Sequence, residues 1–369
     1  MFSPDSLLPG PSPVPWALTD DQRNLYMASL RFARDRLEPL LAGSPNVATW
    51  QETVRLAAAT LDLGAMILPE ELGGLGTERH DLTLVAQALA TGPLERALQL
   101  TLPLPALMVL RTHHALGPVL ARPVQAYFDG TTAIALTVPD IGNATIWQLS
   151  PLGGAASLSM RIDDKQRLIL AERPRDQQSS QPAGIATLGG LVLEQVHADE
   201  AATETPLAVI ARTGCDGVLP AQTYMIEIGL YLTALLTGAM QHTVRFAFDY
   251  AATRQAFRKP LAAHQLVATR LSDMLIATHS THLFLQAINV AYPSAPVSLV
   301  RQLLRHVATE SVNISREFVQ LCGGHGYVEG LPPATRFQTT HWLTQLLLRT
   351  DTALGWLAQP PTANGRADI

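Results

Sequence analysis

The sequence predicts an α+β fold with a helical N-terminal domain, a small middle β-domain and a C-terminal four-helix bundle. Helical periodicity dominates residues 1–130, short apolar runs between turn residues fill 131–217, and long apolar stripes at helical spacing occupy 218–369. With 369 residues, of which 47% are hydrophobic, the chain can form more than one sizeable core. We therefore expect domains at 1–130, 131–217 and 218–369.

Composition narrows the possible partners and location. The formal net charge of −5 gives no broad basic surface for nucleic acid or anionic lipid. The two cysteines, Cys215 and Cys322, are too few for a disulfide scaffold and suit a reducing, cytoplasmic location. We expect no signal peptide, because residues 1–15 carry five prolines and no basic segment. No run of about 18 consecutive apolar residues predicts a transmembrane helix.

The N-terminal part begins with a predicted capping box. Thr19 and Gln22 have the spacing at which a hydroxyl and an amide satisfy the free first-turn amides of a helix, here through Leu37. Pro39 is expected to end this helix. Further helical patterns cover 48–62, 81–90 and 104–110, and the proline and glycines of 68–76 separate the first two of these.

The middle part predicts a small sheet. Short apolar runs at 133–137, 156–162, 167–171, 191–193 and 207–210 alternate with turn residues. Residues 173–183 are polar and contain two prolines, which predicts a surface loop.

Four helices are predicted in the C-terminal part. Apolar positions form one stripe between Ile228 and Tyr250, on a helix of roughly 30 residues. Leu271, Met274 and Leu275 mark a second helix, and a third follows from Val300 to Leu321. The pair Gly323-Gly324 is expected to end the third helix, and 341–356 supplies the fourth.

Several motifs stand in a fixed order along this framework. They are Leu18-Thr-Asp-Asp-Gln22, Pro69-Glu-Glu-Leu-Gly-Gly-Leu-Gly76, Ala135-Leu-Thr-Val-Pro139, Arg254-Gln-Ala-Phe257 with Gln265, and Gln320-Leu-Cys-Gly-Gly-His-Gly-Tyr-Val-Glu-Gly330. Together they resemble the acyl-CoA dehydrogenases, FAD enzymes that introduce an α,β double bond into a CoA thioester. The resemblance covers roughly 18–356 and implies that each FAD lies between two subunits. One subunit's sheet holds the isoalloxazine ring, and the neighbouring bundle holds the pyrophosphate and adenine.

The bundle half of that shared site is complete in this sequence. By resemblance, Arg254 pairs with the pyrophosphate, since an arginine fork suits phosphate oxygens. Phe257 packs beside the adenine, and Gln265 hydrogen-bonds the cofactor. Gln320, Gly323 and Gly324 form a wall of close approach, because glycine leaves space and free amides.

The sheet half departs from the family pattern. Where the family has Ala-Leu-Thr-Glu-Pro and then Gly-Ser-Asp, this chain has Val138, Asn143 and Ala144 at the acid, serine and aspartate positions. Trp147 stands too early to match the family's tryptophan–isoleucine–threonine strand against the flavin. We therefore expect this chain not to hold an isoalloxazine ring in its own sheet.

The catalytic base is also missing. Proton abstraction beside the thioester needs a carboxylate within hydrogen-bond reach. The two positions that the family uses are 24 residues after Gly323 and 26 before Arg254, and they hold Leu347 and Ile228. Glu227 lies one residue from the second position and is a weak candidate base, as is Asp351, one turn past Leu347. We interpret both as ordinary helix-surface carboxylates.

Other chemistry-bearing residues form no recognisable site. His325 is interpreted as a loop residue of the glycine turn, and Cys322 as a small apolar filler. His113, His114, His279 and His282 have no acidic or cysteine partners at metal-ligand spacing, and we expect them to be solvated and the chain to bind no metal.

The leading hypothesis is a non-catalytic subunit of a heteromeric α2β2 acyl-CoA dehydrogenase. Its partners would be a catalytic subunit, with which it shares FAD, an acyl-CoA and an electron-transfer flavoprotein. One alternative is a self-sufficient homotetramer that uses Glu227 as base. A flavin-free pseudoenzyme and a flavin monooxygenase on the same scaffold are the others.

Overall fold

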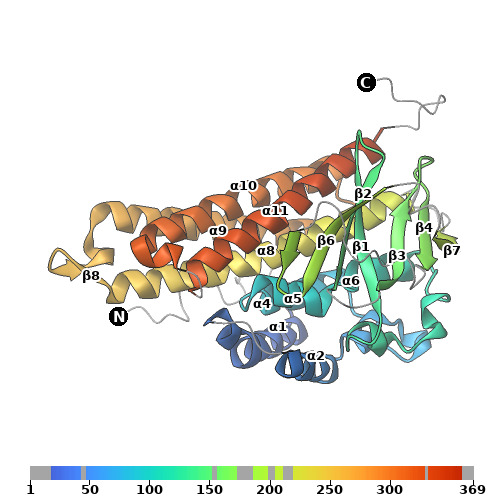
Figure 1. The fold of residues 1–369 in the computed structure, drawn as a ribbon, viewed down its shortest axis with the longest axis horizontal. Coiled ribbons are helices and arrows are strands. Elements are labelled where there is room, and N and C mark those ends of the chain that lie inside the picture. Colours follow the sequence, from blue (N-terminus) through green and yellow to red (C-terminus); the bar gives the residue numbers. More distant parts are fainter. Residues whose placement is uncertain are drawn as a thin grey trace. The chain divides into compact units, whose positions relative to one another are not determined.

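A computed structural model describes residues 18–42, 47–151, 156–172, 186–197, 204–210, 219–328 and 331–359. It confirms the predicted α+β order of helices, sheet and helical bundle (Figure 1). The described residues form two compact units. The first draws on Met1–Pro45, Thr83–Ala97 and Leu232–Leu347, and the second on Asn46–Leu82, Leu98–Tyr231 and Leu348–Ile369.

The predicted capping box opens the first helix, α1 (Asp20–Phe32). The Gln22 amide N–H donates to Thr19 Oγ1 at 3.2 Å, and the Thr19 N–H donates to the Gln22 side chain at 3.1 Å. The helical run reaches Leu37 as predicted, but its last turn, η2 (Ala33–Leu37), is π-helical. A 3₁₀ segment, η3 (Glu38–Ala42), contains Pro39 and follows directly.

The remaining N-terminal helices agree with the predicted patterns and add to them. They are α2 (Val47–Leu61), α3 (Leu63–Ile67), η4 (Glu70–Leu72), α4 (Arg79–Leu89), α5 (Leu94–Thr101), α6 (Leu104–Thr112), η5 (Val119–Ala121) and η6 (Val124–Tyr127). The sequence prediction missed α3 and α5. Both are short, and α3 follows α2 after a single residue, Asp62, in the left-handed conformation.

Seven strands among the described residues of the second unit form one sheet. They are β1 (Ala133–Asp140), β2 (Thr145–Pro151), β3 (Ala156–Ile162), β4 (Leu168–Glu172), β5 (Ala186–Leu188), β6 (Leu191–His197) and β7 (Thr205–Ile210), in the order β5-β6-β2-β1-β3-β4-β7. All five predicted runs are strands, and β2 and β5 were missed. The predicted loop at 173–183 lies outside the described residues.

Pairing of the central strand β1 is asymmetric. It pairs antiparallel with β2 along its second half, from Leu136 opposite Leu149 to Asp140 opposite Thr145. Its parallel pairing with β3 stops at Ala135. The second half of β1 therefore needs other partners on its β3 side, because buried backbone N–H groups are rarely left unpaired.

Among the described residues, the bundle comprises four long helices, a β-hairpin and two short 3₁₀ segments. These are α8 (Pro220–Thr253), β8 (Gln255–Ala256), β9 (Lys259–Pro260), η8 (Leu261–Ala263), α9 (Gln265–Ala291), α10 (Val297–Cys322), η9 (Gly323–Tyr327) and α11 (Pro332–Leu357). A buried core joins α8, α9 and α10 through Met240, Val244, Ala247, Ala251, Leu271, Met274, Ile314, Phe318 and Cys322. Helix α8 is long and apolar enough for a membrane span, but the qualifying segment is wholly buried, as expected for the central helix of a bundle.

Candidate functional site

The six residues predicted to contact FAD in trans lie in the first unit and are all exposed. Arg254 directly follows α8, Phe257 lies in the β8–β9 turn, and Gln265 is the first residue of α9. Gln320 lies in the last turn of α10, and Gly323 and Gly324 open η9.

Arg254 presents an unengaged guanidinium. Its backbone is fixed, because its N–H donates to the Tyr250 carbonyl at 2.8 Å and its carbonyl accepts from the Leu261 N–H at 2.9 Å. Among the described residues, no acceptor lies within hydrogen-bond or ion-pair distance of its side chain. A fixed backbone with a free fork suits recognition of a phosphate oxygen pair.

The β8–β9 turn holds two bulky residues in the left-handed region. Phe257 has φ 51° and Arg258 has φ 67°, as in a type I′ hairpin, where glycine and asparagine are favoured. The Phe257 side chain is 92% exposed, and its ring meets the His264 ring edge-on at 6.0 Å. His264 is itself anchored, with Nε2 3.1 Å from the Ala256 carbonyl. Strained backbone beneath an exposed aromatic ring points to function rather than stability.

The glycine turn η9 contains glycines of two kinds. At Gly326 a Cβ would approach the Val319 carbonyl oxygen to 2.3 Å, so packing within the bundle requires glycine there. At Gly323 and Gly324 no atom of the described residues, adjacent residues in the chain aside, lies within 4 Å of where a Cβ would stand. Gly323 has φ 57° and ψ −130°, which only glycine adopts readily. Gly324 has no such internal reason, and its open side fits close approach by a ligand.

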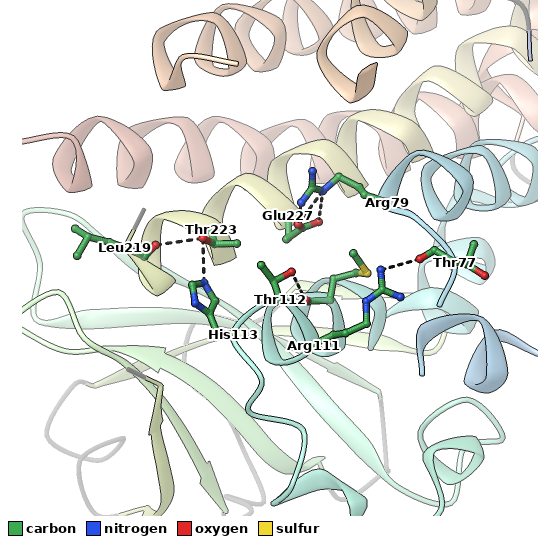
Figure 2. A network of polar contacts seen from close by, with 9 residues as sticks. Thr77, Arg79, Arg111, Thr112, His113, Leu219, Thr223 and Glu227 are labelled. Atoms are coloured by element: carbon green, nitrogen blue, oxygen red, sulfur yellow. Dashed lines mark hydrogen bonds and ion pairs between the residues drawn. The ribbon is translucent and has the colours of Figure 1, made fainter. Parts of the chain in front are cut away.

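Neither position expected for a base carries one. Leu347 and Ile228 are both fully buried. Glu227 lies on α8 with 4% of its side chain exposed, paired with Arg79 at the start of α4. Arg79 Nε lies 2.8 Å from each carboxylate oxygen, and Arg79 NH2 also contacts Oε1 (Figure 2). The interpretation of Glu227 as a surface carboxylate was therefore wrong, and so was that of Asp351, which is 6% exposed.

A second guanidinium supports this buried pair. Arg111 donates to the Thr77 carbonyl at 2.7 Å (Figure 2). It also donates to the Ile67 carbonyl at 3.2 Å. Burial lowers the pKa of Arg111, and the Glu227 carboxylate opposes that shift. Both oxygens of Glu227 accept hydrogen bonds from Arg79 and only 4% of its side chain is exposed, so this carboxylate is held inside the fold by its partner.

Two histidines that we expected to be solvated are engaged in the fold. His113 is buried, with Nε2 3.2 Å from Thr223 Oγ1, and burial lowers its pKa (Figure 2). His282 Nδ1 lies 3.0 Å from the side-chain amide of Gln87. Among the residues that the structure describes, no group of three or more His, Cys, Asp or Glu could hold a metal ion.

On the sheet side of the predicted FAD site, the polar groups of β1 bond to other residues of this chain. The Thr137 N–H donates to the Tyr224 hydroxyl at 3.1 Å, just beyond the point where β1 leaves β3. The Thr137 hydroxyl donates to the Met160 carbonyl. Tyr224 is fully buried, which raises its pKa to about 12. Val138, at the position of the family's acid, is also fully buried.

Polar side chains around the turn between β1 and β2 likewise bond to one another. Asp140 accepts hydrogen bonds from Gln195 at 2.9 Å and from Asn143 at 3.2 Å. Arg349 lies 3.6 Å from Asp140 and stacks over the Trp147 ring at 4.1 Å. Asn143, at the position of the family's serine, is thus tied to Asp140, and Val138 has no polar side-chain atom. These two residues do not supply the polar contacts that the family pattern implies for an isoalloxazine ring.

Comparison with known proteins agrees with this architecture. Residues 229–349 match the family model described as "Acyl-CoA dehydrogenase, C-terminal domain". The mitochondrial isobutyryl-CoA dehydrogenase of Dictyostelium discoideum is 21% identical over 89% of this chain and 85% of its own length. The 3-sulfinopropanoyl-CoA desulfinase of Paraburkholderia xenovorans is 23% identical over 93% of this chain and 97% of its own.

A solved structure confirms the fold. Butyryl-CoA dehydrogenase from Megasphaera elsdenii superposes with a TM-score of 0.65 at 18% identity, covering 93% of this chain and 99% of that one. The fold is that of the acyl-CoA dehydrogenases, and the C-terminal match together with the relatives supports membership of that family.

Proposed function

We propose that this chain is a non-catalytic subunit of a heteromeric acyl-CoA dehydrogenase. It would supply the trans half of an FAD site whose sheet half and catalytic base belong to a partner subunit. The observation that carries the proposal is a contrast within one chain. The six trans residues are exposed, and their polar side chains have no partner among the described residues. The sheet half is instead buried against Tyr224, and the base positions are Leu347 and Ile228.

The bundle half fits the cofactor's phosphate and adenine end. Arg254 offers a free bidentate fork on a fixed backbone. The open space outside Gly323 and Gly324 admits a phosphate or ribose beside backbone amides. Phe257 offers an exposed aromatic face that is held in place by His264.

FAD, when bound, would supply the oxidising power for α,β-dehydrogenation of an acyl-CoA. This chain's own residues would bind and orient the cofactor and take no part in moving a proton from the substrate. Arg254 would neutralise pyrophosphate charge, while Gln265 and Gln320 would each donate a hydrogen bond. We further propose an electron-transfer flavoprotein as electron acceptor and a cytoplasmic location, as the sequence predicted.

The self-sufficient alternative depends on Glu227. Its position one residue from Ile228 favours it. Its burial in a pair with Arg79 weighs against it, because a base must lie within hydrogen-bond reach of the proton that it removes.

The visible spectrum of the purified chain tests the proposal, alone and co-expressed with an acyl-CoA dehydrogenase-like catalytic subunit. We expect the chain alone to be colourless and the mixed tetramer to be yellow. The tetramer should contain about one FAD per heterodimer, because a two-fold symmetric assembly of this kind has one shared FAD site in each half. Stoichiometric yellow protein from this chain alone would overturn the proposal. Colourless protein in both samples would instead indicate the flavin-free pseudoenzyme.

Arg254→Gln in the mixed tetramer tests whether this chain's residues contribute to the FAD site. The substitution leaves an exposed polar side chain, so the tetramer should assemble while losing FAD affinity. Retention of full affinity would contradict the role given to Arg254.

A further inference from the structure

Tyr250 bridges the two segments that carry the candidate phosphate-binding groups. It stands four residues before Arg254 near the end of α8. Its hydroxyl donates to the Cys322 carbonyl, the last residue of α10, at 3.3 Å. The same oxygen lies 3.2 Å from His325 Nδ1 in the glycine turn. One side chain therefore ties the segment leading to Arg254 to both ends of the segment bearing Gly323 and Gly324.

The two contacts of the hydroxyl are chemically compatible. A phenol has one proton to donate and lone pairs to accept with. Donation to the Cys322 carbonyl leaves the oxygen free to accept from His325, which requires the proton of that ring to lie on Nδ1. The Cys322 carbonyl stands at the junction of α10 and η9. The bond to this carbonyl therefore ties Tyr250 to the start of the glycine turn.

An aromatic column holds the tyrosine ring itself. Tyr250 stacks on Phe246 with centroids 6.5 Å apart and planes 15° apart. Phe246 packs edge-on against Phe318 of α10 at 5.4 Å, and Tyr250 meets the His325 ring edge-on at 6.4 Å. Phe318 belongs to the buried bundle core. The hydroxyl is therefore fixed by packing, without help from a ligand.

We infer that Tyr250 is a positioning residue for the pyrophosphate of the cofactor, an inference that rests on the proposed function. It holds Arg254 and the Gly323-Gly324 turn at a set separation before the cofactor arrives. Such preorganisation strengthens binding because the ligand does not have to order the site. Tyr250 acts through these groups and need not touch the ligand.

The test is the affinity of the full-length chain for ADP, a probe that has the pyrophosphate and adenine but no isoalloxazine ring. Tyr250→Phe keeps the stacked ring and removes the tether. We expect it to weaken ADP binding about three- to tenfold, the worth of one such hydrogen bond. ADP dissociation constants would be measured by equilibrium dialysis well below the melting temperature.

Tyr231→Phe is the matched control for a purely structural hydroxyl. Tyr231 bonds Thr101 Oγ1 at 2.8 Å and the Leu98 carbonyl at 3.1 Å in the second unit. It should lower the melting temperature and leave ADP affinity unchanged. If Tyr250→Phe does the same, Tyr250 is structural only and the inference is wrong.

A double-variant cycle with Arg254→Gln separates positioning from direct contact. Because Tyr250 acts by placing the groups around Arg254, the effect of Tyr250→Phe should shrink when Arg254 is already gone. Full additivity would overturn the inference, and so would failure of the wild-type chain to bind ADP, since a preformed half-site must bind its ligand. The proposed function is judged separately, by the colour and FAD content of the mixed tetramer.

Discussion

The pair between Arg79 and Glu227 allows one substitution to separate a structural carboxylate from a catalytic one. Only 10% of the Arg79 side chain and 4% of the Glu227 side chain are exposed. Glu227→Gln preserves the shape of the side chain but leaves a guanidinium buried without its counter-charge. Breaking a buried pair in this way costs about 3–5 kcal/mol. We expect the free energy of unfolding to fall by that amount.

Thermal denaturation of the purified chain is a suitable assay. A chain of 369 residues has an unfolding entropy near 0.8 kcal/mol/K at about 2.1 cal/mol/K per residue, so the loss corresponds to about 4–6 °C in Tm. The control is Glu52→Gln, which breaks the Glu52–Arg55 pair, whose side chains are each 66% exposed. An exposed pair of this kind contributes about 0.5 kcal/mol or less, so its Tm should not move measurably.

A double substitution completes the test. Arg79→Met with Glu227→Met removes both buried charges and should recover most of the lost stability, since replacing a buried pair by apolar side chains is often neutral. The reasoning is refuted if Glu227→Gln leaves the Tm unchanged while abolishing turnover of acyl-CoA by a chain that still binds flavin. That result would make Glu227 the base of a self-sufficient enzyme.

Three further predictions rest on individual contacts. Arg254→Gln should weaken FAD binding to the mixed complex by about tenfold or more, the worth of a charge-assisted contact, without changing the Tm; fluorescence titration and melting curves check both. Tyr224→Phe should lower the unfolding free energy by about 1–3 kcal/mol in urea denaturation, because the buried Thr137 N–H loses its acceptor. Burial lowers the pKa of His242 to about 4, whereas its pKa in the unfolded chain is about 6.5. As the pH falls, the unfolded state therefore binds a proton at this residue before the folded state does. The free energy of unfolding should thus decrease as the pH drops from about 6.5 to about 4. His242→Gln should flatten that part of the Tm–pH curve. The hydrogen bond from His242 is the main cause that lowers the pKa of Glu38 to about 2, so a further loss of stability should follow between about pH 4.5 and 2.

The sequence was most informative where the determinants are local. The capping box of Thr19 and Gln22 involves residues three apart, and the structure contains both of its hydrogen bonds. The end of α10 at Cys322 follows from the conformational freedom of Gly323. The long apolar stripes predicted the bundle helices because burial of one helix face imposes its period on the sequence.

It was least informative where partners come from distant parts of the chain. Glu227 meets Arg79 across 148 residues, and neither residue type reveals the other in one sequence. An isolated carboxylate is far more often exposed than buried, so the surface interpretation was the natural one. Tyr224 was not singled out at all, because its role depends on β1 parting from β3 at Ala135.

The bundle half of the candidate site is exposed and the sheet half is closed, and this difference favours an assembly in which two unlike chains share one FAD site. In a homomer every chain must supply both a trans half and an open sheet half, so each would constrain the sequence equally. Here Arg254 and Phe257 are exposed, and Phe257 has a left-handed backbone conformation although 92% of its side chain is exposed. The sheet half has meanwhile been closed by Tyr224 and by the contacts of Asp140. An exposed bundle half beside a closed sheet half is what the proposed function requires, since another chain would then supply the ring site. Under the proposed function, about one FAD per heterodimer is expected, because a site would form only where this bundle faces a partner's open sheet.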